Sequence, residues 1–349
     1  MQYRAFLEDV QNLLCCCKES RPSLASTTEM VQQEFKKSFR ELMTKIEGKV
    51  TIQNQNNTCP ACSSERVTYW FTKITNQQKY PICRCSDCKG AFVLPRPSNS
   101  QITTFYQDEY YRKSDTLNAS EQLAKLLKSE AEYPNSMLDA ARMIGQAKDL
   151  ANGKKFLDVG GGYGFFSQAA LSAGFDVTAI EPSPTCRKVF TLLNGFVPEA
   201  CMFDRTFTSK YREKFDVVLM SQVLEHVVDL DEAVNSLNML LGKNGIAAIA
   251  VPHFKSLVSM FHGKKDMFII PPEHLNFFSM SCLTTLFSRH HFSLLRRETI
   301  SRFPPESIRK IILISLVTRI ANFALGGVLR FADSIGKGMY INCYFRKEG

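Results

Sequence analysis

The sequence predicts an α/β protein: a doubly wound, Rossmann-like sheet with a small cysteine-rich module in front of it. Three observations support this prediction. From residue 155 onward, apolar runs of strand length alternate with helical stretches, a pattern typical of a parallel sheet with right-handed crossovers. The first run leads into a glycine-rich turn at 160–164. Upstream of it, four cysteines stand in two pairs of Cys-x-x-Cys spacing.

Length and charge set the outer bounds. A chain of 349 residues exceeds the size at which a single core stops growing, about 250–300 residues, so we expect one large domain and a smaller one. The formal net charge of +9 is modest for this length, and basic and acidic residues are intermixed. This balance allows an anionic substrate, a phospholipid surface or RNA as a partner and selects none of them.

Two segments bear on the cellular compartment. The first nine residues contain no charged-then-apolar leader, which favours a reducing cytosol over a secreted, disulfide-bonded protein. The longest apolar stretch, 308–331, is interrupted by four cations, whereas a spanning helix needs about 20 mostly apolar residues. We therefore expect a cytoplasmic protein in which this stretch either packs internally or contacts a membrane peripherally.

Three regions differ in composition and periodicity. They are residues 1–57, 58–97 and 98–349. The first is expected to be a helical extension and linker, because apolar side chains recur at three- and four-residue steps before a polar run. The second is the cysteine-rich module. The third is the α/β domain, with a long helix expected at about 120–150 and a helical insertion at about 304–333.

The cysteine-rich module is predicted to be a zinc ribbon. Its paired thiols are Cys59, Cys62, Cys85 and Cys88. Two residues between thiolates let both sulfurs of a pair reach one tetrahedral ion at about 2.3 Å, and the second pair completes the coordination. Four sulfur ligands leave no open position, so we expect structural rather than catalytic Zn²⁺. Cys83, one residue from Cys85, is expected to be a spare thiol.

Elements of the α/β domain follow from the pattern of apolar runs. Strands are expected at 156–159, 177–180, 199–203, 215–220 and 246–251. Helices are expected at 165–172, 184–193 and 230–241. Most of these strand runs are apolar over their length rather than alternating, as in parallel strands buried on both faces.

The glycine-rich turn and the end of the next strand predict a nucleoside-binding site. Glycines at the carboxyl end of a strand allow a tight turn close to a ligand, and here they are Gly160, Gly161 and Gly162. The dinucleotide fingerprint is not met, because Gly164 comes one position early. Glu181 ends the following strand, where a carboxylate accepts hydrogen bonds from ribose hydroxyls.

Two further carboxylates flank this predicted site. Asp158 stands directly before the glycines, where it is expected to orient the turn or to attract the ammonium group of a ligand. Asp204 follows the run at 199–203. It is expected either to accept a hydrogen bond from an adenine amino group or to be a surface carboxylate.

These motifs resemble those of the class I methyltransferases that use S-adenosylmethionine (SAM). The resemblance is carried by Leu157–Gly164, Glu181–Ser183, Phe215–Val218, Leu224–Val227, Gly245–Ala247 and Val251–Pro252. They are similar to motifs of ubiquinone-biosynthesis O-methyltransferases and of sugar-modifying methyltransferases. The paired cysteines, a Pro-x-Pro and a Tyr-Tyr pair upstream resemble the front part of sugar C-methyltransferases. The resemblance covers about residues 58–300 and resumes at 338–346.

The resemblance implies SAM as the cofactor and a seven-stranded sheet whose last strand is antiparallel. Residues 292–297 and 339–345 fit the sixth and the last of these strands. Many members have cysteine where this chain has Gly161. Ubiquinone-type enzymes often carry glutamate at the position of Gln222, where it is said to join Glu225 and His226 in a metal site. Gln222 therefore argues against a catalytic magnesium, and we place it with the cofactor-binding residues.

Methyl transfer requires groups that align the acceptor and remove its proton. The acceptor atom must lie about 3 Å from the methyl carbon for an in-line displacement, and histidine is suited to take a proton near neutral pH. His226 follows the fourth strand, and His274 lies in a loop that similar enzymes fold over the active site. These two are the candidate catalytic residues. For each, the alternative is a structural histidine that caps a loop.

We therefore expect SAM-dependent methyl transfer to an oxygen or carbon of a small or lipid-linked acceptor, such as a sugar, a phenol or a polyketide-like molecule. Two alternatives stay open. One is a methyltransferase that acts on RNA or protein through the ribbon, although the ribbon offers few cations and aromatic residues for this: Lys73, Lys79, Arg84 and Lys89 with Trp70 and Tyr80. The other is a non-catalytic scaffold, which has no need for a ribose-binding acid such as Glu181.

Overall fold

The computed structural model describes residues 58–105, 118–132, 136–302 and 326–348. The helical extension predicted for 1–57 lies outside the described residues, as does most of the insertion predicted for 304–333. Of that insertion, residues 326–334 are helical. No helix in the described ranges is both long and apolar enough to cross a bilayer.

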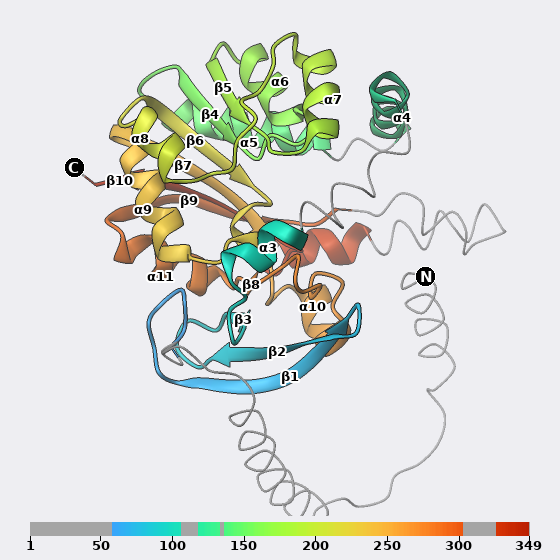
Figure 1. Cartoon of the computed structure of the whole chain (residues 1–349), viewed down its shortest axis with the longest axis vertical. Coiled ribbons are helices and arrows are strands. Elements are labelled where there is room, and N and C mark those ends of the chain that lie inside the picture. The colour runs from blue at the N-terminus through green and yellow to red at the C-terminus, as the bar shows by residue number, and fades with distance from the viewer. Residues whose placement is uncertain (1–57, 106–117, 133–135, 303–325, 349) are drawn as a thin grey trace, which may run out of the picture. The chain divides into compact units, whose positions relative to one another are not determined.

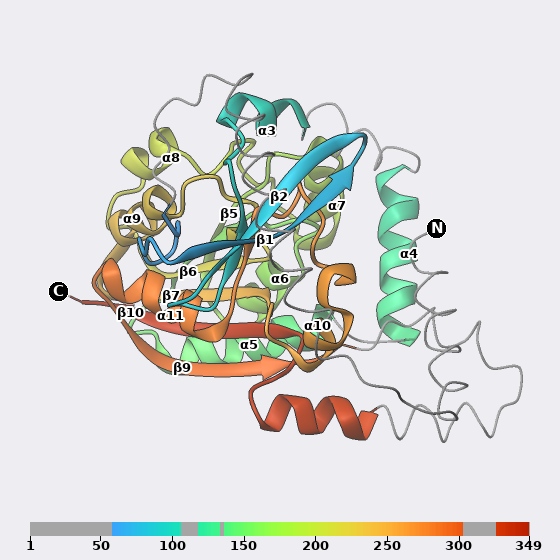
Figure 2. The same ribbon diagram turned by 90° about the horizontal axis from the view of Figure 1, so that it is seen from below.

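The larger of two sheets has the strand order β5-β4-β6-β7-β10-β9 (Figure 1). Its strands are β4 (Lys155–Val159), β5 (Asp176–Ile180), β6 (Phe215–Ser221), β7 (Leu241–Pro252), β9 (Phe292–Ile300) and β10 (Tyr340–Lys347). The neighbouring strands β5, β4, β6 and β7 are parallel. Strand β10 runs antiparallel to both neighbours, and Figure 2 shows it beside β9. The predicted doubly wound sheet with an antiparallel last strand is therefore confirmed.

The strand predicted at 199–203 is reduced to one bridge, between Ile180 and Glu199 at the β5 edge. The N–H of Cys201 donates back to the carbonyl of Glu199 at 3.0 Å, and Asp204 already caps the next helix. The chain thus turns away before a second bridge forms. Six strands make up this sheet in the described residues, and Glu199 stands where the seventh was predicted.

Helices cover both faces of this sheet (Figure 1). One face carries α5 (Ser136–Leu150), α6 (Phe165–Ser172) and α7 (Pro184–Asn194), and the other carries α8 (Arg205–Lys210), α9 (Leu230–Leu240) and α11 (Met280–Arg289). Helix α4 (Ala119–Glu132) contacts α7. The single helix predicted at 120–150 is two helices, and Pro134 stands between them in the sequence, where proline disfavours a continuous helix. The Glu130 carboxylate accepts the N–H groups of Ser136 and Met137 at 3.2 and 3.0 Å and so caps α5.

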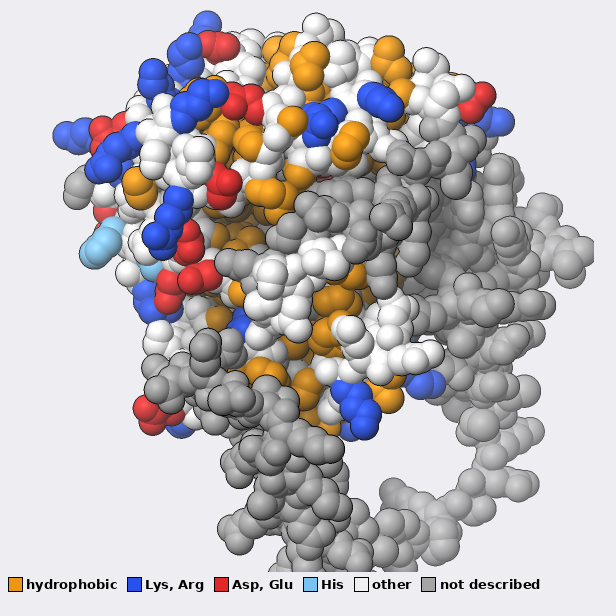
Figure 3. All heavy atoms as spheres, viewed as in Figure 1, with side chains coloured by type: hydrophobic (Ala, Val, Ile, Leu, Met, Phe, Trp, Pro, Cys, Tyr) orange, Lys and Arg blue, Asp and Glu red, His pale blue; other side chains and the backbone are white. Residues whose placement is uncertain are grey.

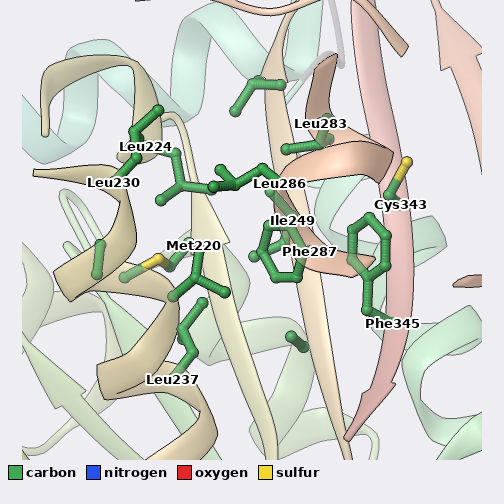
Figure 4. Close-up of a cluster of buried hydrophobic side chains, with 14 of the residues drawn as sticks. Met220, Leu224, Leu230, Leu237, Ile249, Leu283, Leu286, Phe287, Cys343 and Phe345 are labelled. Atoms are coloured by element: carbon green, nitrogen blue, oxygen red, sulfur yellow. The ribbon is translucent and has the colours of Figure 1, made fainter. Parts of the chain in front are cut away.

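The core under α9 and α11 includes a stack of aromatic rings (Figure 4). The rings of Phe287 on α11 and Phe345 on β10 lie parallel, with centroids 4.1 Å apart and planes inclined by 8°. Phe292 meets Phe287 edge-on at 5.4 Å. All three side chains are buried, so their contacts fix α11 against the antiparallel edge of the sheet.

Replacing Phe287 with leucine should lower the free energy of unfolding by about 1–2 kcal/mol, because it removes the ring contacts and leaves part of the site unfilled. Urea denaturation followed by circular dichroism measures this difference. As a control, Leu192→Ala on α7, where the side chain is 52% exposed, should change stability by less than about 0.5 kcal/mol. Equal losses from the two substitutions would contradict the packing described for α11.

The smaller sheet joins the ribbon to the α/β region. Its order is β1 (Val67–Thr75), β2 (Gln78–Cys85), β3 (Ala91–Val93) and β8 (Asn276–Phe277), and neighbouring strands are antiparallel. Strand β8 lies far along the sequence from the other three. The cysteines of the ribbon and Phe92 also pack in the same apolar cluster as Leu230 and Leu286. Ribbon and α/β region therefore share both a sheet and a core.

Short elements complete the side of the molecule where β8 lies. They are α3 (Asn99–Phe105), η3 (Leu224–His226), α10 (Leu257–His262) and η4 (Gly263–Lys265). The turn η3 contacts β8 directly. This contact brings the residues after β6 next to a strand of the ribbon sheet.

Candidate functional site

The glycine-rich turn between β4 and α6 is constrained from two sides. Gly160 and Gly162 have φ values of +68° and +53°, which favour glycine. A Cβ at Gly160 would lie 2.9 Å from Cγ2 of Val223, and a Cβ at Gly161 would lie 3.0 Å from the ring of Phe190. Glycine at 161, where similar enzymes often have cysteine, therefore accommodates the Phe190 ring.

Glu181 is held against this turn. One carboxylate oxygen accepts the N–H of Gly162 at 2.9 Å, and the other accepts the N–H of Ser183 at 2.7 Å. Burial raises the pKa of Glu181, while these two N–H groups oppose the increase. A carboxylate has about four acceptor positions, so two remain for a ligand beside the glycines.

Asp158 lies inside the protein, beneath the turn. Its carboxylate accepts the hydroxyl of Ser167 on α6 at 2.7 Å, and its exposed fraction is 2%. Burial raises the pKa of Asp158 to about 6. In the structure this residue links the end of β4 to the first turns of α6, next to the negative charge of Glu181.

The other two predicted cofactor residues lie at the ends of their elements. Asp204 is the N-cap of α8, and its carboxylate accepts the N–H of Phe207 at 2.9 Å. Gln222 follows β6 with a φ of +59°, and its backbone N–H donates to Ala250 of β7 at 2.8 Å. Asp204 thus has a structural partner, and Gln222 stands at the carboxyl edge of the parallel strands.

The structure brings His226 and His274 together. Their rings meet edge to face with centroids 4.8 Å apart. Nδ1 of His226 donates to the carbonyl of Glu273 at 2.7 Å, and Nδ1 of His274 donates to the carbonyl of Phe268 at 2.8 Å. Because a carbonyl only accepts, the His274 ring carries its proton on Nδ1, and Nε2 is its basic nitrogen. The His226 ring has a second backbone partner at Gln222, so its two nitrogens share two backbone contacts.

Both histidines are neutral at pH 7. Burial lowers the pKa of His226, and burial together with the neighbouring His226 lowers the pKa of His274 to about 3. A neutral imidazole is the form that takes a proton from an acceptor. Other histidines form hydrogen bonds away from this pair. For example, His253 contacts the carbonyl of Gly338, and His290 contacts the carboxylate of Asp231.

Glu225 is a buried carboxyl that belongs to the same group. One ligand atom of each of Glu225, His226 and His274 lies within 4.8 Å of the others. Glu225 is 1% exposed, and neither carboxylate oxygen has a hydrogen-bond partner among the described residues. Burial raises the pKa of Glu225 to about 8, so at pH 7 this group is mostly a protonated acid beside two neutral imidazoles.

The donor set of this group does not fit magnesium. Mg²⁺ takes oxygen ligands in octahedral geometry, whereas two of the three donors here are imidazole nitrogens. Gln222, at the position of the additional glutamate, carries a neutral amide that contacts Ala250. We therefore derive no step of the reaction through a magnesium ion.

The ribbon cysteines converge as a zinc site requires. The four Sγ atoms lie within 4.8 Å of one another, with Cys59 to Cys88 at 3.6 Å and Cys62 to Cys85 at 3.5 Å. Tetrahedral zinc with bonds of about 2.3 Å places sulfurs about 3.8 Å apart, so these separations fit. Cys83 lies opposite Tyr69 in the β1–β2 pair and is outside the four-sulfur group.

Sequence reasoning did not single out three residues that shape these sites. They are Ser167, Glu225 as a proton-holding group, and Arg96. Ser167 and Glu225 stand close to predicted motifs, and an acid directly before a candidate histidine was a usable signal. Arg96 gave none, because its partners are backbone carbonyls more than 100 residues away in the sequence.

Residues 129–296 match the sequence model of a family described as "Methyltransferase domain". The chain contains a methyltransferase domain. Its sequence is 35% identical over 130 residues to a ubiquinone biosynthesis O-methyltransferase of Actinobacillus pleuropneumoniae, a match that spans 32% of this chain and 53% of the relative. An uncharacterized methyltransferase of Bacillus licheniformis is 28% identical over 41% of this chain and 71% of the relative. The chain spans about half the length of the ubiquinone relatives it matches.

Solved methyltransferases cover more of the chain at lower identity. A SAM-dependent methyltransferase from Archaeoglobus fulgidus has a TM-score of 0.44 and 16% identity, covering 64% of this chain and 99% of its own. A 1,6-didemethyltoxoflavin-N1-methyltransferase from Burkholderia thailandensis, solved with S-adenosylhomocysteine, has a TM-score of 0.45 and 15% identity, covering 76% and 98%. In this chain, the matched methyltransferase domain contains the glycine-rich turn, Glu181 and both candidate histidines.

Proposed function

We propose that this chain transfers the methyl group of SAM to an oxygen or carbon of a small or lipid-linked acceptor, such as a sugar, a phenol or a polyketide-like molecule. One observation carries the proposal: the Glu181 carboxylate is fixed beside the glycine-rich turn by the N–H groups of Gly162 and Ser183. A carboxylate at this place in a doubly wound sheet accepts ribose hydroxyls. A buried acid without such a ligand is costly to maintain.

The residues around the turn suit each part of SAM. Glu181 is the ribose acceptor, and the glycines at 160–162 allow the backbone to approach the methionine portion. We assign the remaining contacts with SAM to two residues. Gln222 directly follows β6, and Asp204 directly precedes α8. When bound, SAM supplies a methyl carbon activated by the sulfonium charge.

His226 is the residue that we assign as proton acceptor. It follows β6 in the turn η3, at the carboxyl edge where the cofactor is expected, and burial keeps its imidazole neutral by lowering its pKa. His274, whose pKa burial and the neighbouring His226 lower to about 3, is the residue that we assign to contact with the acceptor molecule. The Glu225 carboxyl, with its pKa raised by burial to about 8, can exchange a proton with this pair near neutral pH.

The contacts of Trp70, the tryptophan of the ribbon, favour a small acceptor over RNA. The Trp70 ring is covered by the Arg84 guanidinium, 3.3 Å from the ring centroid, and by Phe254 at 5.6 Å. It is therefore engaged within the protein rather than open for base stacking. On the face in Figure 3, Lys and Arg are interspersed with Asp and Glu, without one continuous basic field.

Glu181→Gln should weaken SAM binding about 10- to 100-fold, because an amide replaces a charged acceptor of hydrogen bonds that contribute about 1.5–3 kcal/mol. Isothermal titration of the purified, zinc-loaded protein measures this change. The matched control is Asp176→Asn at the opposite end of β5, which removes an exposed ion pair with Lys155 and should leave SAM affinity unchanged. Absence of SAM binding by the folded wild-type chain would refute the proposal and leave the scaffold alternative.

A further inference from the structure

Arg96 connects the ribbon segment to two loops of the methyltransferase domain. It follows β3 by three residues. Nη2 donates to the carbonyls of Val227 and Val228 at 2.8 and 2.7 Å, Nε donates to Val228 at 3.2 Å, and Nη1 donates to Leu275 at 3.1 Å. Burial lowers the pKa of Arg96 to about 10, against the opposing charge of Asp229, so the guanidinium is charged at pH 7.

The carbonyls that Arg96 binds are next to the candidate catalytic histidines. Val227 directly follows His226, and Leu275 directly follows His274. A displacement of either carbonyl therefore moves the backbone that carries one of the rings. The two rings are 4.8 Å apart between centroids, so a shift of one loop relative to the other changes their contact.

Further hydrogen bonds close the same junction. The carbonyl of Leu275 also accepts the N–H of Val93 in the ribbon at 3.0 Å, and the N–H of Leu275 donates to the carbonyl of Glu225 at 2.7 Å. The side-chain amide of Asn276, in β8, donates to Leu224 and Val227 at 3.0 and 2.8 Å. Ribbon, β8 and the turn η3 are thus one hydrogen-bonded unit.

Only an arginine fits the centre of this unit. The planar guanidinium has five donors in a fixed fork, and it makes the four bonds to three carbonyls in two separate loops. A lysine ammonium has the charge, but its donors radiate from one atom and do not span the same carbonyls. A neutral side chain would remove both of the donors that Arg96 gives to the half-buried carbonyl of Val228.

We propose that Arg96 is a positioning residue that couples the zinc ribbon to the His226–His274 pair. Ribbon folding sets the place of Arg96, and Arg96 sets the relative position of the two histidine loops. The ribbon metal thereby controls the candidate active site without contributing a ligand to it. The proposal rests on the proposed function in so far as the histidines act on an acceptor, but the coupling itself is a structural property that is measurable without one.

The ring nitrogens of the two histidines report the coupling directly. In protein labelled with ¹⁵N histidine, the wild-type chain should show one defined tautomer for each ring, the Nδ1–H form for His274, and each signal is assigned by its loss in His226→Gln or His274→Gln. Arg96→Met should give averaged tautomer signals for both rings, because the backbone beside each ring is no longer held at Val227 and Leu275. The rings then shift relative to the carbonyls that they contact. In Arg96→Lys, the tautomer signals should be intermediate between those of the wild type and those of Arg96→Met. Zinc content should stay at one ion per chain in each variant, and SAM affinity should stay within about threefold.

A matched control separates this coupling from a general loss of ribbon stability. Arg66→Met removes an exposed cation of the ribbon that pairs with Asp87 and should leave both ring signals as in the wild type. Unchanged tautomers in Arg96→Met, whatever its melting temperature, would overturn the proposal. If Arg96→Met does not fold, unchanged tautomers in Arg96→Lys would overturn it equally. Failure of the wild-type chain to bind SAM would refute the proposed function instead, and the tautomer signals would still decide the coupling.

Discussion

Replacing both Cys59 and Cys88 with serine is expected to release zinc and unfold the ribbon. The two thiols lie 3.6 Å apart, each from a different Cys-x-x-Cys pair, so the double variant removes one ligand from each pair. A structural zinc site of this kind contributes on the order of 10 kcal/mol of apparent binding free energy, which is also folding free energy. The apolar side chains that β2 and β3 bury, such as Ile82, Phe92 and Val93, pack against partners in the α/β region. The ribbon strands therefore have little core of their own apart from that region.

The loss should extend to the adjoining part of the methyltransferase domain. The hydroxyls of Ser279 and Ser281 both donate to the carbonyl of Cys88 at 2.7 Å, and Arg289 donates to the carbonyl of Ala61 at 2.9 Å. Both ends of α11 are therefore attached to the two Cys-x-x-Cys turns. Without the metal these carbonyls lose their fixed positions, and β8 loses its partner strand β3.

Metal analysis and hydrogen–deuterium exchange measure these effects. The double variant should contain no zinc, and its amides in β8 and α11 should lose protection, while those in β4 and β5 keep it. The matched control is Cys83→Ser, a buried thiol outside the four-sulfur group, which should retain one zinc per chain. Retention of zinc and of α11 protection in the double variant would show that the four thiols are not the metal site.

Local patterns sufficed to predict the ribbon cysteines, the glycine-rich turn and Glu181. In each case a short local pattern gives the position: the spacing of the cysteines brings their sulfurs together, and the strand pattern places the turn and Glu181 at the carboxyl edge of the parallel strands. Their roles in binding stay predictions. Local patterns could not show that the strand predicted at 199–203 stops after one bridge. The strand stops because the N–H of Cys201 donates back to the carbonyl of Glu199, and apolar composition does not reveal that turn. The helix break before α5 could have been predicted, because Pro134 stands between α4 and α5 in the sequence.

The composition of the candidate active site was predicted only in part. His226 and His274 were both named, but their pairing depends on loops that are joined by backbone hydrogen bonds, which leave no trace in residue types. Arg96 donates to backbone carbonyls that are far away in the sequence, so no residue pattern identifies these partners. The buried state of Glu225 follows from its tertiary surroundings, since the same Glu-His dipeptide on a surface turn would be solvated.

Glu225→Gln is expected to stabilise the protein and to impair methyl transfer. The carboxyl is buried without a hydrogen-bond partner among the described residues, and glutamine has nearly the same shape without the charge. The pKa of Glu225 is raised to about 8 in the folded state from its ordinary value of 4.5. Folding therefore favours the protonated form: the contribution of this group to stability is complete below about pH 4.5 and is lost as the pH rises through about 8.

The stability difference between Glu225→Gln and the wild type should consequently grow with pH. Between pH 5 and pH 7 we expect it to increase by about 2 kcal/mol in favour of the variant, measured as free energies of unfolding in urea at each pH. Glu121→Gln, on the exposed surface of α4, is the control and should show a difference that changes little over this range. Glutamine cannot exchange a proton with His226, so the rate of methyl transfer to an acceptor should fall although the variant is more stable. Higher stability with lower activity is expected when a destabilising carboxyl has a catalytic role. An equal advantage for the variant at pH 5 and pH 7 would mean that the carboxyl is solvated, and the role proposed for it would be wrong.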